Sequence, residues 1–230
     1  MPEEVLLDSL RSIADNGNQI SRTTFIDNMK VEIPYIMKRD SVGLIDVTYM
    51  SGQYEGALTG ETVDIMMGRI ITRLNVSLSV DSGLESLGYG YAIRIVNSSR
   101  KAYVISGNNS PVNETEDDSY LYPVELGTTP LTFYYYVGPR SADSEEEATG
   151  IEITYGKKDN NGDFDASAMT NRKVIVPLCN TLDGTIPRAY WLNRNSIYNI
   201  SILLKKESKG NVCSVITDPY RLGEIVVGIE

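Results

Sequence analysis

The chain has 230 residues, 41% of them hydrophobic, which is enough to bury one large core or two small ones. Its 31 acidic and 21 basic residues give a net charge of -10, which would repel phosphate backbones and anionic lipids, so we expect no nucleic-acid partner. Histidine, the usual general base and commonest zinc ligand, is absent, so we expect no enzyme and no cofactor or metal.

Residues 1–20 are expected to form an N-terminal helix or arm, because apolar residues recur at helical spacing over residues 3–13 and acidic residues come first. The chain contains no run of about 18 apolar residues, so we expect no membrane span in the mature chain. The chain begins with Met1-Pro2-Glu3-Glu4, which is acidic where a signal peptide would be basic, so we expect a mature chain from which the leader is absent.

Short strands follow this arm. The clearest alternation lies in residues 70–80, where one face carries Ile70, Thr72, Leu74, Val76, Leu78 and Val80. Further strands are expected at residues 89–96, 101–105, 131–137, 151–155, 173–176, 198–204 and 224–229. No repeated helical segments separate them, which favours an antiparallel sandwich or barrel over a βαβ sheet.

A polar segment, residues 106–119, contains almost nothing apolar and predicts a long exposed loop or a domain boundary. We therefore divide the rest of the chain into an N-terminal domain of residues 21–112 and a C-terminal domain of residues 113–230.

Several local patterns favour structural roles over chemical ones. Cys179 and Cys213 are too few for a disulfide framework, and whether they pair stays open. The oxygen-rich residues 159–165 superficially resemble a calcium loop, but the glycine is misplaced and Thr170 stands where the glutamate ligand should be, so we expect a hairpin turn. Glycosylation sequons begin at Asn75, Asn97, Asn113 and Asn199, but such short matches arise by chance.

The aromatic residues leave two interpretations open. The chain has 15 tyrosines, and Tyr134, Tyr135 and Tyr136 suit either strand packing, which we favour, or an adhesive surface. A surface carbohydrate-binding or nutrient-capture module would use Trp191 and exposed tyrosines to stack on sugar rings. A hydrolase without histidine would need two facing carboxylates in a deep pocket.

Residues 192–202 (LNRNSIYNISI) resemble a fimbrillin pattern, in which an Arg-Asn pair and a short gap precede a tyrosine and an alternating strand. Here the pattern falls on Arg194, Asn195 and Tyr198. Residues 69–80 are similar to the basic residue and strand of the N-terminal half of these pilins, and residues 131–138 to their aromatic strand. The chain thus resembles Bacteroides-type fimbrillins, the type V pilins, over roughly residues 65–205.

This resemblance implies a mostly β fold of two transthyretin-like antiparallel β-sandwich domains in tandem. It also implies a lipoprotein precursor exported to the outer membrane and a structural or adhesive subunit of cell-surface fimbriae. The partners would be other fimbrial subunits and host or bacterial surface ligands. An arginine-specific protease often removes an N-terminal strand in this family, and Arg22, Arg39, Arg69 and Arg73 all fit by residue type.

Residues 221–230 are the candidate donor strand for assembly by β-strand complementation. Their apolar residues would be awkward in solvent, and a sheet that lacks one strand can accept such a segment from a neighbouring subunit. The candidate donor residues are Ile225, Val226, Val227 and Ile229. An ordinary last strand that completes its own sheet is an equally good interpretation.

Overall fold

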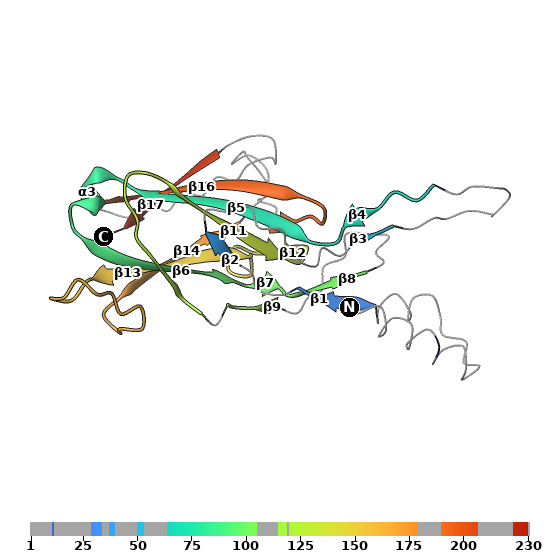
Figure 1. Cartoon of the computed structure of the whole chain (residues 1–230), viewed down its shortest axis with the longest axis horizontal. Coiled ribbons are helices and arrows are strands. Elements are labelled where there is room, and N and C mark those ends of the chain that lie inside the picture. The colour runs from blue at the N-terminus through green and yellow to red at the C-terminus, as the bar shows by residue number, and fades with distance from the viewer. Residues whose placement is uncertain are drawn as a thin grey trace.

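The computed structural model describes residue 11 and residues 29–33, 37–39, 50–52, 64–104, 115–118, 120–178, 190–206 and 223–229. These residues form mostly β structure (Figure 1). The early strands are β1 (Lys30–Glu32), β2 (Met37–Arg39), β3 (Met50–Ser51), β4 (Gly68–Arg69), β5 (Thr72–Val80), β6 (Tyr89–Val96), β7 (Ser98–Ser99) and β8 (Lys101–Tyr103). The later ones are β9 (Thr115–Glu116), β10 (Tyr122–Val124), β11 (Leu131–Val137), β12 (Arg140–Ala142), β13 (Gly150–Lys157), β14 (Arg172–Pro177), β15 (Tyr190–Leu192), β16 (Ile197–Lys206) and β17 (Gly223–Ile229).

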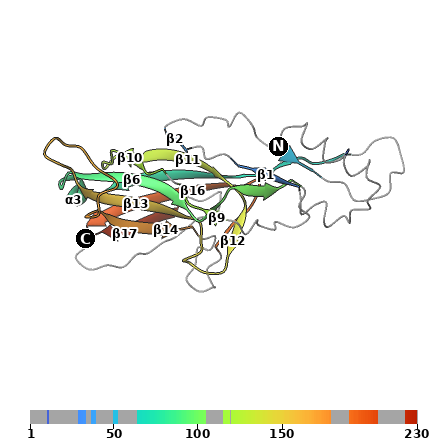
Figure 2. The same cartoon turned by 90° about the horizontal axis from the view of Figure 1, so that it is seen from below.

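Two larger sheets dominate the molecule. One has the strand order β17-β16-β5-β11-β2, and the other has the order β10-β6-β13-β14. The two sheets face one another along the long axis of the molecule (Figures 1 and 2). Residues from both enter one hydrophobic core, so the described residues form a β-sandwich.

The core is built by alternation along each strand. In β5, Leu74, Val76 and Leu78 are fully buried, while the intervening Arg73, Asn75 and Ser77 are partly exposed. The predicted burial of one face of residues 70–80 is therefore confirmed. The strands expected at residues 89–96 and 131–137 are confirmed with the same bounds.

One turn of helix closes an end of the sandwich. Helix α3 (Ser82–Glu85) connects β5 of one sheet to β6 of the other, and Asp81 caps it by accepting a 2.8 Å hydrogen bond from the Leu84 N–H. Leu84 is buried in the same core as the strands. The N-cap thus fixes an apolar side chain over the end of the core.

A smaller core lies beside the main one. The ribbon β1–β8 contributes Val31 and Ala102, and these pack with Ile33, Ile70, Ile71 and Tyr136. Three further ribbons pair β3 with β4, β7 with β9, and β12 with β15.

Strand direction differs from the sequence-based expectation. We expected an antiparallel sandwich, and the four-stranded sheet is antiparallel throughout. In the five-stranded sheet, however, β16 pairs in parallel with both β5 and β17. Alternation reports which face of a strand is buried and says nothing of its direction, so the sequence could not reveal this mixed sheet.

The expected pair of tandem sandwiches that meet between residues 112 and 113 is not confirmed. Strand β5 precedes that point and pairs with β11 and β16, which follow it. In the other sheet, β6 pairs with β10 and β13 in the same way. Strands from both sides of the polar segment therefore share both sheets and one core.

Some sequence-based predictions lie outside the described residues. Arg11 is helical, but the rest of the segment expected to form the N-terminal helix or arm is not described. Cys179, Cys213, Arg22 and the Asn113 sequon also lie outside the described part of the chain. Within that part, no helix has the length and apolar character needed to cross a membrane.

Candidate functional site

The Arg194–Asn195 pair lies in the turn between β15 and β16. Asn195 adopts a left-handed backbone conformation with φ of 56°, which Asn tolerates better than most residues with a side chain. Its side-chain Oδ1 accepts a 3.2 Å hydrogen bond from the Arg69 N–H. The motif therefore marks a tight turn that leads into β16.

This turn is bonded to the start of β5. The Asn195 N–H donates to the Ile71 carbonyl at 3.0 Å, and the Arg73 N–H donates to the Ser196 carbonyl at 2.9 Å. The Thr72 hydroxyl donates to the Asn193 carbonyl at 2.7 Å. Because β5 and β16 run in parallel from this point, the turn holds the register of the two strands.

Tyr198 anchors the same turn from within the core. Its ring is buried, and its hydroxyl accepts a 3.0 Å hydrogen bond from the Asn193 N–H. Burial raises the pKa of this hydroxyl above its ordinary value. The tyrosine of the motif thus binds the turn to the hydrophobic core.

Arg194 extends the turn to a neighbouring ribbon. Its Nη2 donates a 2.7 Å hydrogen bond to the hydroxyl of Ser51 in β3, and partial burial lowers the pKa of the guanidinium. Arg194, Asn195 and Tyr198 therefore share a structural role. They join the β3–β4 ribbon, β5 and β16 at one end of the sandwich.

Strand β17 carries the candidate donor residues. It pairs in parallel with β16 from Ile200 opposite Gly223 to Lys206 opposite Ile229, and it stands at the end of the strand order of its sheet. The register places Ile225 opposite Ile202 and Val227 opposite Leu204. In this structure, the strand completes its own sheet.

Some of the candidate aromatic residues are buried and others are exposed. Tyr135 and Tyr136 are buried, which supports strand packing, while Tyr134 is partly exposed with the Arg73 guanidinium 5.8 Å from its ring centre. Trp191 is 49% exposed on β15, opposite Ser141 of β12. Trp191 is thus accessible, as a sugar-stacking residue would need to be.

Other sequence candidates have local roles. Residues 159–165 form a turn in which the Asp159 carboxylate accepts hydrogen bonds from the N–H groups of Asn161 and Asp163, each at 2.8 Å. Two of the sequon asparagines, Asn75 and Asn199, are hydrogen-bonded to each other across β5 and β16 at 2.7 Å. The described residues contain no group of three or more Cys, Asp or Glu side chains that could hold a metal ion.

The candidate cleavage arginines lie in strands where the structure describes them. Arg39 is in β2, and Arg69 is exposed in β4. Arg73 is in β5, and its Nε donates a 2.8 Å hydrogen bond to Asn75. Of Arg69 and Arg73, Arg69 is the more exposed.

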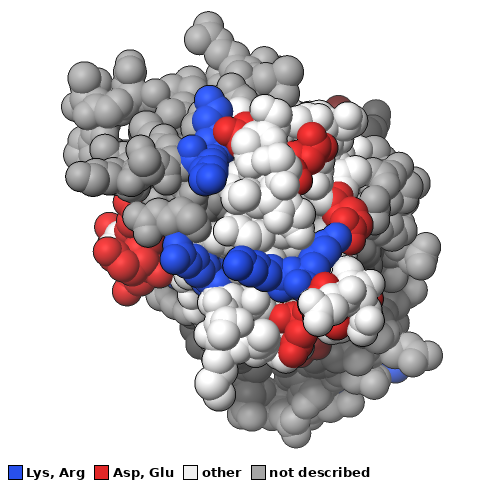
Figure 3. Space-filling model, turned by 90° about the vertical axis from the view of Figure 1, so that its left-hand side faces the viewer, with Lys and Arg blue, Asp and Glu red and all other residues white. Residues whose placement is uncertain are grey.

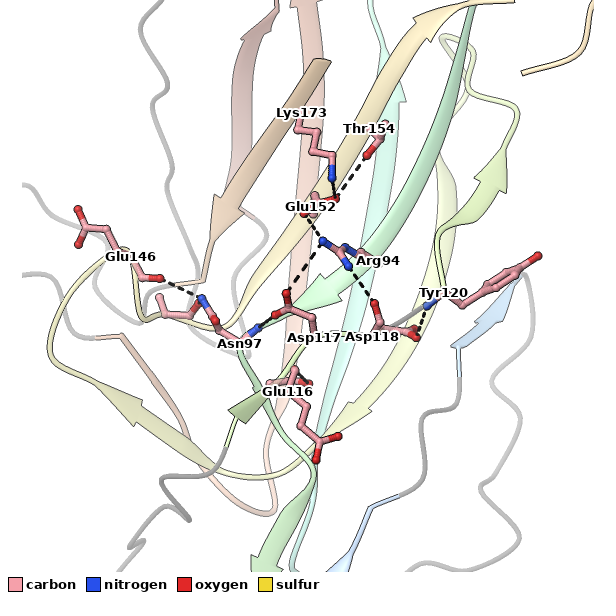
Figure 4. Close-up of polar contacts among 12 residues, drawn as sticks. Arg94, Asn97, Glu116, Asp117, Asp118, Tyr120, Glu146, Glu152, Thr154 and Lys173 are labelled. Atoms are coloured by element: carbon pink, nitrogen blue, oxygen red, sulfur yellow. Dashed lines mark hydrogen bonds and ion pairs between the residues drawn. The ribbon is translucent and has the colours of Figure 1, made fainter. Parts of the chain in front are cut away.

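An ionic cluster that the sequence did not reveal lies on the face of the four-stranded sheet opposite the core (Figure 4). The Glu152 side chain is 5% exposed, and it lies 2.8 Å from Arg94 Nη2 and 3.3 Å from Lys173 Nζ. Burial raises the pKa of Glu152, but hydrogen bonds and charges from Arg94 and Lys173 outweigh burial and leave the pKa below its ordinary value. The cluster ties together β6, β13 and β14. In the sequence, the only sign of this cluster is that polar residues occupy the alternate positions of these strands.

No family model matches the chain, and no curated protein matches it. Among solved structures, it is similar to the tip fimbrial protein Mfa3 from Porphyromonas gingivalis with a C-terminal truncation. That match has 12% identity and a TM-score of 0.45, and it covers 86% of this chain and 71% of Mfa3.

Two further similar structures are candidate cell adhesion proteins. The one from Bacteroides eggerthii has 12% identity and a TM-score of 0.42, and the match covers 80% of this chain and 65% of that protein. The one from Bacteroides uniformis has 15% identity and a TM-score of 0.35, and the match covers 63% of this chain and 49% of that protein. At such identities and TM-scores, these similarities do not by themselves assign a function.

Proposed function

We propose that this chain is an adhesive structural subunit of cell-surface fimbriae that assembles by β-strand complementation through β17. The observation that carries the proposal is the position of this strand. It is the last of the described strands, it stands at the edge of its sheet, and among those strands it pairs with β16 alone.

A terminal edge strand can be exchanged without disturbing the order of the other strands. If β17 leaves, the backbone groups of β16 that it satisfied lose their partners. The buried row Ile200, Ile202 and Leu204 of β16 also loses its neighbour in the sheet. The same segment of a second copy would restore both interactions. Exchange of β17 between two chains therefore keeps the number of β16–β17 contacts unchanged.

The connection to β17 has 16 residues. Residues 207–222 join β16 to β17, and a fully extended segment of that length spans roughly 50 Å. A strand that pairs with the next subunit instead of its own generates a head-to-tail chain, which stays open if the rotation between subunits does not close a ring.

The proposal also covers the location, export and partners of the subunit. We place the subunit at the cell surface, exported as an outer-membrane lipoprotein precursor, with other fimbrial subunits as its partners. An arginine-specific protease that cut at exposed Arg69 would separate β2 from the rest of the chain and open the β11 edge of the sheet, opposite β17. Histidine-free composition suits a non-enzymatic filament protein.

Strand complementation is tested by truncation and rescue. A chain that ends at residue 220 should lose stability and should bind a synthetic peptide of residues 221–230, as followed by tryptophan fluorescence or NMR. A peptide with Ile225→Asp and Val227→Asp is the matched control and should not bind, because these positions lie opposite buried Ile202 and Leu204.

A folded truncated chain that ignores the peptide would contradict the proposal. If the truncated chain does not fold alone, it should fold when produced together with the peptide. Failure of that rescue would count equally against strand complementation.

A further inference from the structure

The β3–β4 ribbon lies at the end of the molecule opposite α3 (Figure 1) and carries exposed apolar side chains. Met50 is in β3, and Ile65, Met66 and Met67 come directly before β4. These four side chains are between 48% and 92% exposed. Large apolar side chains that gather on a surface mark contact sites for other molecules, and methionine adapts readily to the shape of a partner. The ribbon is therefore a candidate interaction surface.

One face of the ribbon is bound to the rest of the molecule. The Ser51 hydroxyl accepts the 2.7 Å hydrogen bond from Arg194 Nη2. A Cβ added to Gly68 would lie 3.7 Å from the side-chain nitrogen of Asn195. The turn between β15 and β16 thus holds the ribbon in place from this side.

The opposite face is a continuous apolar surface. A Cβ added to Gly52 would lie 2.6 Å from Ile65 Cγ2 and 3.0 Å from Met67 Sδ, so both side chains fold over this glycine. Met50 and Gly52 flank Ser51, and alternation along an extended strand therefore turns them away from the side that Ser51 faces. We call Met50, Ile65 and Met67 the apolar face of the ribbon.

Charges of opposite sign lie at the two ends of this apolar face. Asp64 precedes Ile65 at one end, and Arg69 lies in register with Met50 at the other. Both charged residues are exposed. Two ribbons that pack antiparallel about a twofold axis would bring the acidic end of each beside the basic end of the other. The apolar face thus complements a second copy of itself in both polarity and charge.

The far end of the molecule is a poorer partner for this face. Figure 3 shows that end, where Lys and Arg side chains form a row with Asp and Glu side chains beside it. An apolar surface packed there would remove these charges from water, which costs free energy. A second ribbon has its charges at the ends of its apolar face and not at the centre, so ribbon-to-ribbon packing avoids this cost.

We propose that the apolar face of the β3–β4 ribbon binds the same face of a second copy of this chain in a twofold dimer. Such a contact closes on itself and joins only two chains, whereas exchange of β17 can extend a row of subunits. The inference goes beyond the proposed function because it needs no exchange of β17.

The test is analytical ultracentrifugation of the full chain over a range of concentrations. We expect a monomer–dimer equilibrium with a dissociation constant of about 10 to 100 µM, because few side chains of each copy are buried in the contact. Met67→Ser should weaken the dimer by about tenfold or more. Leu87→Ser is the matched control, because Leu87 is 40% exposed next to α3, at the far end of the molecule, and should leave the constant unchanged.

Association through β17 is separated from the ribbon contact by a locked chain. Ser201→Cys and Glu224→Cys in one molecule, with Cys179 and Cys213 replaced by serine, would hold β17 in its own sheet after oxidation, because the two positions are register partners. The locked chain should still form the dimer. Association that disappears on locking would belong to exchange of β17 and would overturn the ribbon contact.

The two charged residues provide the most specific test. Asp64→Arg and Arg69→Asp chains should each associate at least about tenfold more weakly than the wild-type chain, because like charges would meet in the dimer. An equal mixture of the two variants should regain the wild-type constant, because every acidic position then meets a basic one. A mixture that stays as weak as its components would overturn the proposal. So would a dimer that Leu87→Ser abolishes, which would indicate head-to-tail packing, or a chain that stays monomeric at about 1 mM.

Discussion

Replacing Asn195 with alanine is expected to lower the free energy of unfolding by about 2 kcal/mol, because two contributions are lost together. The first is conformational, since φ at this residue is 56° and a Cβ-bearing side chain other than Asn pays about 1 kcal/mol there. The second is the 3.2 Å hydrogen bond from the Arg69 N–H to Asn195 Oδ1, worth about 0.5 to 1 kcal/mol at an exposed site.

Glycine separates these contributions. Asn195→Gly loses the hydrogen bond but keeps access to the left-handed conformation, so it should be less damaging than alanine by about 1 kcal/mol. Urea unfolding at neutral pH, followed by tyrosine and tryptophan fluorescence, measures both variants.

The control pair is Asn160→Ala and Asn160→Gly. Asn160 is exposed and is not among the described residues with positive φ, so alanine should be no worse than glycine there. The interpretation of the turn would be refuted if Asn195→Ala were as stable as Asn195→Gly.

Three further predictions concern the core and the ionic cluster. Glu152→Gln should lower stability at neutral pH by about 2 kcal/mol, because Arg94 and Lys173 lose a charged partner. Since the pKa of Glu152 is lowered by folding, the wild-type chain should lose this stability as pH falls below the ordinary glutamate range, and the variant should lack that acid-dependent loss in urea titrations. Tyr135→Phe should raise the thermal midpoint, because the Tyr135 hydroxyl is buried with no partner among the described residues, and a lower midpoint would contradict this. Phe133→Ala should cost about 3 to 5 kcal/mol and shift one cooperative transition, whereas two separate transitions would argue against a shared core.

Strands and their buried faces could be predicted from the sequence, and their partners could not. The alternation of residues 70–80 reflects local side-chain geometry, which is why that face was predicted correctly. The polar segment of residues 106–119 signals exposure to solvent, but β6 and β10 on either side of it pair directly. Strands on both sides of this segment therefore share one sheet, which its polarity alone did not indicate.

In the candidate site, too, the residues could be predicted from the sequence and their contacts could not. Arg194, Asn195 and Tyr198 stand out in the sequence, yet their contacts with β3 and β5 arise only when distant segments meet.

Exchange of β17 between chains is tested most directly by a cysteine crosslink. Ser201 and Glu224 are register partners in β16 and β17, and the spacing of neighbouring strands, about 4.8 Å, falls within the range that a disulfide can bridge. Chains with Ser201→Cys and chains with Glu224→Cys, both with Cys179 and Cys213 replaced by serine, would be mixed under assembly conditions and oxidised. A chain that carries both new cysteines reports pairing within one molecule. The account predicts disulfide-linked chains between the two single-cysteine partners. Crosslinking only within the double-cysteine chain, with none between chains, would contradict it.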